Sequence, residues 1–522
     1  MSKAKWLLVF LIALGVAIPA QAVEVNLGGF PSYFRQRVRY IKNATFLNTL
    51  SQSQAEALGF GTNKDNIFFA DTTFRLTPQL VLSDSVTIRT QVDVFSNNLW
   101  GGLTSELLGG GSSLVNSAIS PDDRFRGALL TGPGAVDRGE GFMRFRMLHI
   151  DMVLPNNLGF VRIGRQPFDW GLGILANGGW DPHSDLGFLV DRFLWLKTFP
   201  AGSSSITLVG VSDIFTGGNS LASGSGTGYD IGAVAVIFNN PNISGINLTI
   251  GGYVFPYIHQ NNFDAPDPQT GDAFSSTGDL SRFTLYAGLI DLKTDTWRLV
   301  GELQGGWGEI DNFTAPGNTA DISNQIIWAV RGELYPSWPV KVIGAEFGWA
   351  DGDDGNTSLV DDIEGNVIVF NPAYNLDNLL FKHMIPNIYQ SATAAGGVFA
   401  RGESSVQNAY YARAYATVKL LDYLSFTPQV LVAWNEETSG IIQPGTDIGS
   451  YIGTEVEGTL TWTVHPGVNF DLIGSVVFAG SGLEDMLEQQ GEALTGEGVG
   501  SADSTPYAIQ GRLLVFIDQF FK

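Results

Sequence analysis

The sequence contains no cysteine. This absence excludes a disulfide framework, a thiolate metal site, a catalytic cysteine and a covalently attached c-type haem. Positive charge is also scarce, because Lys and Arg number 29 against 52 Asp and Glu, which gives a formal net charge of -23. A chain this acidic is a poor partner for nucleic acid, so we predict no nucleic-acid function.

Long apolar runs are missing too, except at the N-terminus. Lys3 and Lys5 precede an apolar run over residues 6–18, and residues 19–22 (Pro-Ala-Gln-Ala) form a small-x-small cleavage site. The run is shorter than the roughly 20 residues that a membrane-spanning helix requires, which argues against an N-terminal anchor. We therefore predict a secretory signal peptide at residues 1–22 and a single domain over residues 23–522.

The rest of the chain is rich in residues that favour strands and turns, with 64 Gly and 34 Phe. Extended segments are joined alternately by short turns and long polar loops. Turn residues mark eight short connections, near residues 83–85, 155–158, 200–202, 239–245, 293–296, 336–339, 421–423 and 465–467. Nine longer loops lie between them, near residues 43–66, 97–140, 168–188, 214–228, 258–277, 310–322, 351–406, 436–450 and 481–505. This count predicts about eighteen strands, an even number as in bacterial single-chain barrels.

The segments alternate polar and apolar residues with a period of two. In residues 86–94, Thr87, Arg89, Gln91 and Asp93 are polar, and most residues between them are apolar. One face therefore meets an apolar phase and the other meets water. A soluble β-sandwich gives the same alternation, but the signal peptide and the sorting of short turns from long loops favour a membrane barrel. We predict an all-β, transmembrane antiparallel β-barrel with short periplasmic turns and long extracellular loops.

Two further patterns agree with this fold. Aromatic residues lie near strand ends on the apolar face, as in interfacial girdles; they are Tyr40, Trp297, Trp328, Trp349, Trp434, Trp462 and Phe478. Alternate residues from Tyr507 to Phe521 are mostly apolar, which resembles the closing-strand signature of outer-membrane barrels, although Gln519 interrupts it and Lys522 follows it. We therefore expect the chain in the outer membrane, in contact with its lipid and lipopolysaccharide.

The strand phase predicts which charges face the lumen, because a charge facing lipid at the midplane costs about 2 to 4 kcal/mol. The expected basic lining is Arg35, Arg37, Arg39, Arg75, Arg89, Arg144, Arg146 and Arg162, with further arginines at Arg282, Arg298, Arg331, Arg413 and Arg512. The expected acidic lining is Glu302, Glu333, Glu346, Glu455, Glu457 and Asp471. A basic arc facing an acidic arc would set a field across the pore. Alternatively, these charges pair within the wall. A phase shift after Arg146 also predicts a β-bulge.

The segment after residue 163 is the most distinctive local sequence. Gly164-Arg165-Gln166 and Trp170-Gly171-Leu172-Gly173 resemble outer-membrane porins of the alginate-export type. The resemblance covers about thirty residues and implies an eighteen-strand barrel with an arginine-rich pore. We also expect the glycine-rich loop 168–188 to fold inward as a constriction, because glycine permits close backbone approach. Asp169, Trp170, Asp185 and Asp191 belong to this site, the aspartates meeting Arg144, Arg146 or Arg162. A surface loop is the alternative.

No cluster of residues predicts catalysis, a bound metal or another cofactor, so we do not predict an enzyme. The favoured function is a porin with a water-filled channel for ions and small polar or charged solutes. One alternative is a barrel sheath or export channel that works with a partner, either a multihaem cytochrome or a polysaccharide secretion system. An adhesin is another, and a homo-oligomer is left open. A sheath would carry haem absorbance on purification, whereas a porin would conduct ions alone.

Overall fold

The computed structural model describes residues 24–27, 31–43, 66–99, 144–184, 187, 189–215, 228–230, 232–265, 276–311, 319–352, 362–363, 368–371, 373–385, 388, 406–439, 446–495 and 505–520. The predicted signal peptide lies outside these residues. Among them, no helix has both the length and the apolar character needed to cross a membrane.

Strands dominate the described chain. The first half contains β1 (Glu24–Leu27), β2 (Tyr33–Lys42), β3 (Asn66–Leu76), β4 (Pro78–Ser83), β5 (Val86–Leu99), β6 (Arg144–Leu154), β7 (Gly159–Pro167), β8 (Leu189–Ala201), β9 (Ser204–Phe215), β10 (Gly228–Asp230), β11 (Ala233–Ile243) and β12 (Ile246–Ala265). The second half contains β13 (Ser276–Lys293), β14 (Trp297–Asp311), β15 (Thr319–Leu334), β16 (Val340–Ala350), β17 (Asp362–Ile363), β18 (Ala409–Leu421), β19 (Leu424–Asn435), β20 (Tyr451–His465), β21 (Val468–Ala479) and β22 (Tyr507–Phe516).

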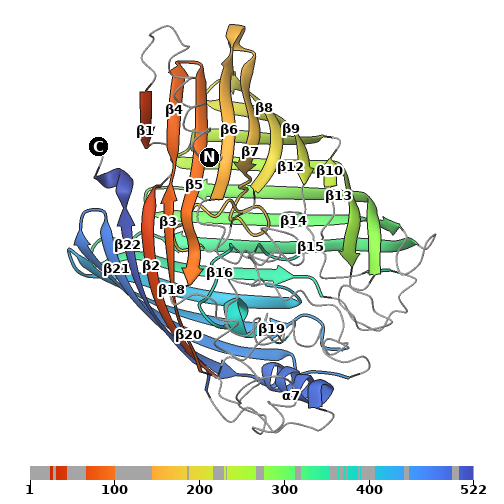
Figure 1. Ribbon diagram of the computed structural model, residues 1–522, viewed down its shortest axis with the longest axis vertical. Helices are drawn as coiled ribbons and strands as arrows, with labels where there is room; N and C mark the ends of the chain where they lie inside the picture. The colour runs from red at the N-terminus through yellow and green to blue at the C-terminus, as the bar shows by residue number, and fades with distance from the viewer. Residues whose placement is uncertain are drawn as a thin grey trace, which may run out of the picture.

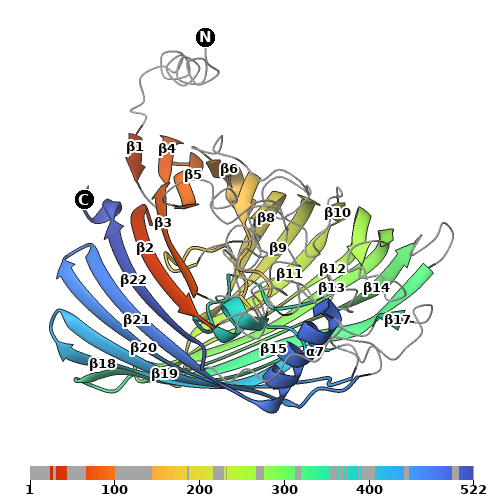
Figure 2. The ribbon, with the colours of Figure 1, turned by 60° about the horizontal axis from the view of Figure 1, so that its bottom comes forward.

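Within the described residues, helical structure is confined to four pieces. They are the short 3₁₀ helices η2 (Pro155–Asn157) and η4 (Ile517–Gln519), the π-helix η3 (Leu380–Met384) and the α-helix α7 (Ser481–Thr495). The sequence predicted neither η3 nor α7, since both lie in segments interpreted as loops. In Figures 1 and 2, η3 lies within the ring of strands.

The strands form one closed antiparallel barrel (Figures 1 and 2). Successive wall strands pair with each other, and β2 pairs with β22 from Tyr33 opposite Phe516 to Lys42 opposite Tyr507, which closes the ring. β3 and β4 occupy one wall position, as do β10 and β11, whereas β1 and β17 are short additions. The wall therefore has eighteen positions, as predicted. Closure matters because it leaves the wall without an unpaired strand edge.

The alternation of connections is also confirmed. All eight predicted short turns join consecutive wall strands, for example β8 to β9 at residues 202–203 and β20 to β21 at residues 466–467. Gly202 at one of these turns has φ +65°, a left-handed conformation that glycine adopts without steric cost. The predicted bulge is present as well, since the register of β5 with β6 skips Arg146 between Phe145 and Met147.

The outer face of the wall is apolar. Large side chains that are exposed on it include Phe193, Val330, Phe347, Trp462 and Phe478, each 38% exposed or more. Tyr410 and Trp434 stack on neighbouring strands of this face with ring centroids 5.3 Å apart. This surface has the composition that contact with lipid requires.

The strand-phase rule fails on β13. Its register places Phe283 and Leu285 on the buried inner face, and Arg282 is exposed on the opposite face. The prediction that Arg282 lines the lumen is therefore wrong. The physical reason is that the inner face of β12 and β13 is itself apolar, because a segment inside the barrel packs against it.

Candidate functional site in the barrel interior

A segment that follows β7 crosses the interior of the barrel. We call residues 168–184 the first inward segment. At one end, the backbone N–H groups of Leu172 and Gly173 donate to Oε2 of Glu302 on β14, at 2.5 and 2.9 Å. At the other end, Nη1 of Arg35 on β2 donates to the carbonyls of Pro182 and Ser184, at 2.8 and 3.0 Å. β2 is the first and β14 the eleventh of the eighteen wall positions, so the segment joins nearly opposite sides.

Two glycines make the turn against Glu302 feasible. Gly171 has φ +56° and Gly173 has φ +82°, values that favour glycine. A Cβ atom on Gly171 would also lie 2.6 Å from Oε2 of Glu302. The Trp-Gly-Leu-Gly motif is therefore explained by the close approach of this turn to a wall carboxylate.

The second half of the segment faces the arginines of the first wall strands. Nη1 of Arg75 lies 3.3 Å from the Gly179 carbonyl, and Nη2 of Arg146 lies 3.5 Å from the Gly178 carbonyl. Within the segment, Asp169 accepts from the Gly178 N–H at 2.6 Å and from the Trp180 indole N–H at 2.5 Å. The carbonyl groups of this half therefore receive guanidinium donors from three strands, β2, β3 and β6.

A second inward segment, residues 368–371 and 373–385, meets the first. The backbone N–H of Asn371 donates to the Ile174 carbonyl at 2.5 Å, and its side-chain amide donates to the Leu175 carbonyl at 2.7 Å. The wall holds this segment through Glu455 of β20, which accepts from the Leu380 N–H at 2.7 Å, and through Gln325 of β15. Sequence analysis missed this segment, although its apolar residues Ile368, Phe370, Leu379, Leu380 and Phe381 are unusual for a solvated loop.

Titratable groups in the two segments have shifted pKa values. Burial lowers the pKa of His183 well below its usual range, and the nearby guanidinium groups of Arg512 and Arg35 lower it further. Burial raises the pKa of Asp377 to about 7, even though the Phe381 N–H donates to its carboxylate and favours the charged form. In both segments, burial therefore favours the uncharged form of a titratable side chain.

The predicted basic residues lie on the inner face, where most have carboxylate partners on the neighbouring strand. Arg35, Arg37, Arg39, Arg75 and Arg146 are buried, and Arg89 and Arg162 are partly buried. The ion pairs join Arg37 to Asp71 at 2.8 Å, Arg75 to Asp93 at 2.7 Å, and Arg89 and Arg162 to Asp151 at 2.9 and 2.6 Å. These four arginines therefore follow the second of the two predictions, in which the charges pair within the wall. The side chain of Arg144 lies outside the described residues.

The predicted acidic residues also lie on the inner face. Glu346 receives Arg331 at 2.6 Å and Arg413 at 2.5 Å, and Asp471 receives Arg512 at 3.0 Å. Glu333 accepts from the hydroxyls of Tyr335 and Tyr415. Glu302 and Glu455 instead accept from the backbone of the inward segments, and Glu457 accepts from Thr459. Their roles therefore differ: some balance arginines, and others anchor a segment.

The structure revises the expected constriction site. Asp169 bonds within its own segment and Trp170 packs on Tyr253, with ring centroids 4.9 Å apart. Asp191 does not meet Arg146 or Arg162, because β8 begins at Leu189 and its register turns Asp191 to the outer face, where it pairs with Arg165 at 2.7 Å. A charged pair on the outer face costs little free energy near a strand end, because the membrane–water interface is close to that position. Asp185 lies outside the described residues.

No family model matches the sequence, and no curated protein matches it. Among solved structures, OccAB1 of Acinetobacter baumannii is 10% identical, with 93% of this chain and 95% of that chain covered and a TM-score of 0.45. OpdO of Pseudomonas aeruginosa is 10% identical, with 93% and 96% covered and a TM-score of 0.43. A BenF-like porin of Pseudomonas fluorescens is 11% identical, with 95% and 98% covered and a TM-score of 0.45. By its own closure and its apolar outer face, this chain is an antiparallel β-barrel of the outer-membrane type.

Proposed function

We propose that the protein is a porin of the Gram-negative outer membrane, through which ions and small polar solutes diffuse. The observation that carries the proposal is the first inward segment, which joins Arg35 on β2 to Glu302 on β14 across the interior. An apolar outer face surrounds an inner face that is charged on β2 to β6 and on β14 to β22. Such a wall separates lipid from a polar interior, and an inward segment narrows the path.

The inward segments act as a constriction in this proposal. Guanidinium groups of the wall donate to backbone carbonyls of the first segment, Glu302 accepts from that segment, and Glu455 accepts from the second. Fixed dipoles and charges of this kind select among solutes that must shed water to pass. The outer face would contact membrane lipid and lipopolysaccharide.

A sheath around a protein partner is not favoured. A sheath needs an interior wide enough for the partner, whereas here two segments of the chain occupy the interior and bond to each other through Asn371 and Ile174. Export of a polysaccharide chain meets the same obstacle.

Planar-bilayer recording of the purified protein tests the proposal. A porin gives discrete conductance steps and, under a salt gradient, a reversal potential that reports its ion preference. A folded protein that inserts into the bilayer without any conductance steps would contradict the proposal.

A further inference from the structure

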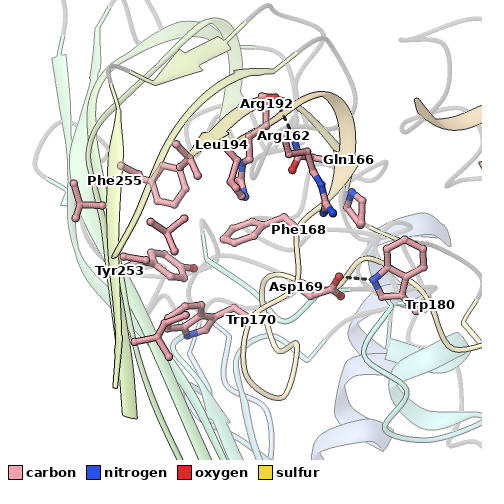
Figure 3. A pocket seen from close by; sticks show the side chains of 17 residues that line it. Arg162, Gln166, Phe168, Asp169, Trp170, Trp180, Arg192, Leu194, Tyr253 and Phe255 are labelled. Carbon is pink, nitrogen blue, oxygen red and sulfur yellow. Dashed lines mark hydrogen bonds between the residues drawn. The ribbon is translucent and has the colours of Figure 1, made fainter. Parts of the chain in front are cut away.

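The interior contains a cavity of about 300 Å³ between the first inward segment and the inner face of β7 to β12 (Figure 3). Phe168, Asp169 and Trp170 contribute from the segment, and Tyr253 and Phe255 contribute from β12. The structure provides this space where the lining residues of β9, β11 and β12 are uncharged. A cavity of about 150 Å³ with an apolar lining is known to hold benzene, so this one has room for a larger ring system.

Aromatic rings form much of the lining. Tyr253 stands edge-on to Trp170 at 4.9 Å and to Phe255 at 5.4 Å between ring centroids. Phe168 lies 5.7 Å from Tyr253 and 6.1 Å from Phe255. Ring pairs at these separations have the tilted and edge-to-face geometry that aromatic rings prefer, so a further ring in the cavity would find faces and edges to contact. Val209, Val211, Ala235 and Ile237 add aliphatic surface.

Both arginines at the cavity are bound to carboxylates of the wall: Arg192 to Asp213, and Arg162 to Asp151, which also accepts from Arg89. Arg192 donates to both oxygens of Asp213, at 2.6 and 2.5 Å, and its guanidinium lies 4.2 Å from the Phe168 ring centroid. Arg162 donates to both oxygens of Asp151, at 2.6 and 3.0 Å. Each carboxylate takes the Nε–H and one Nη2–H of its arginine, so an anionic ligand that bound the remaining Nη1 would lie beside a carboxylate of the same charge.

Asp169 does not supply a cation site either. Its two oxygens accept from the Gly178 N–H and the Trp180 indole N–H, as the dashed line to Trp180 in Figure 3 shows. The cavity therefore offers apolar and aromatic contacts, and its three lining charges have partners within the protein.

We propose that this cavity is a binding site for an uncharged aromatic molecule of one or two rings. The inference deepens the proposed channel function and rests on it, because the site would lie on the path of a solute through the barrel. Aromatic contact supplies the affinity, and the paired charges disfavour carboxylates and ammonium ions.

The test compares two probes of the same ring system, neutral 2-naphthol and anionic 2-naphthoate, at neutral pH. Binding is measured by equilibrium dialysis of the folded protein in detergent, with the same detergent on both sides of the membrane. We expect saturable binding of 2-naphthol and at least about tenfold weaker binding of 2-naphthoate. Equal or tighter binding of 2-naphthoate would overturn the proposal, as would the absence of saturable 2-naphthol binding. This comparison needs no variant.

A matched pair of variants locates the site. Ala235 and Val236 are neighbours on β11, Ala235 lining the cavity and Val236 exposed on the outer face. Ala235→Phe places a ring in the cavity and should weaken 2-naphthol binding at least about tenfold, whereas Val236→Phe adds the same ring toward lipid and should change it by less than about twofold. Equal affinities in the two folded variants would place the binding elsewhere and overturn the assignment.

The outcome is separable from that of the channel proposal. Conductance without 2-naphthol binding removes the aromatic site and leaves the porin. Saturable 2-naphthol binding without conductance removes the porin and leaves a cavity that binds aromatic molecules.

Discussion

Arg37 and Arg512 lie directly opposite each other across the strand pair that closes the barrel. A carboxylate offsets the repulsion between these two positive charges on each side: Asp71 on β3 pairs with Arg37, and Asp471 on β21 pairs with Arg512. The four side chains therefore form a row over four neighbouring strands, with the acids outside and the bases at the seam. Two like charges are tolerated at the seam only while both acids are present.

This row predicts that Asp471→Asn destabilises the barrel. The substitution leaves the buried Arg512 without its carboxylate beside Arg37, and breaking a buried pair in this way typically costs about 3 to 5 kcal/mol. Urea unfolding in detergent, followed by the loss of heat-modifiable migration, measures the change. The control is Asp422→Asn, which removes the partner of Lys419 in an exposed turn and should leave the midpoint unchanged. Equal unfolding midpoints for the two variants would contradict the stabilising role of Asp471 in this row.

Glu302 is predicted to hold the constriction in place. Glu302→Ala removes the acceptor of the Leu172 and Gly173 N–H groups, so the first inward segment should loosen and single-channel conductance should rise or fluctuate. Leu303→Ala is the matched control, because Leu303 is the next residue on β14 and is 39% exposed on the outer face. A conductance of Glu302→Ala equal to that of Leu303→Ala would show that the segment does not limit the current.

Asp169 is predicted to influence ion preference. Asp169→Asn removes a negative charge from the first inward segment but leaves an amide oxygen for the Gly178 N–H. The reversal potential under a KCl gradient should shift toward anions, because a fixed negative charge in a narrow pore favours cations. Asp422→Asn, in the turn between β18 and β19, should cause no shift. Identical potentials in the two variants would argue against a constriction at Asp169.

Acidification should loosen the first inward segment through His183. The neutral imidazole is favoured in the folded segment, because burial and the nearby Arg512, Arg35, Lys382 and Arg37 lower its pKa below 6.5. A group whose folded pKa is depressed below its unfolded value, here by stabilising the neutral base, contributes stability above the unfolded pKa. That contribution is lost as the pH falls below 6.5.

Hydrogen exchange of residues 181–184 measures this effect. Protection in the wild type should fall between about pH 7 and pH 5, the range in which an ordinary histidine gains its proton. His183→Gln cannot gain that charge, so its protection should change much less. A pH dependence as steep in His183→Gln as in the wild type would assign the effect to another group.

The wall was predictable because a strand that faces lipid on one side and water on the other must alternate. Residues 86–94 show the alternation clearly, and turn residues mark the short connections, so the strand count followed from the sequence. The prediction for Arg282 failed for the converse reason: the inner face of β13 belongs to the buried apolar cluster of the interior, so Phe283 and Leu285 lie inside and Arg282 lies outside.

The interior was less predictable, since it depends on contacts between residues far apart in sequence. Glycines at 171 and 173 indicated a close approach but not its partner Glu302, which lies about 130 residues further along the chain. The aspartates that pair with the arginines of β2 to β7 follow from cross-strand register, which a strand pattern alone does not give. The second inward segment had a signal in its apolar residues 368–385, within a loop of polar composition.

The first inward segment also has a mechanical consequence. A ring of eighteen hydrogen-bonded strands resists stretching along its circumference but flattens readily, because flattening breaks no bond between strands. The links to Glu302 and Arg35 run across the ring between nearly opposite walls. They work as a tie along one diameter, so the barrel cannot lengthen along that diameter beyond the reach of the segment without first breaking them.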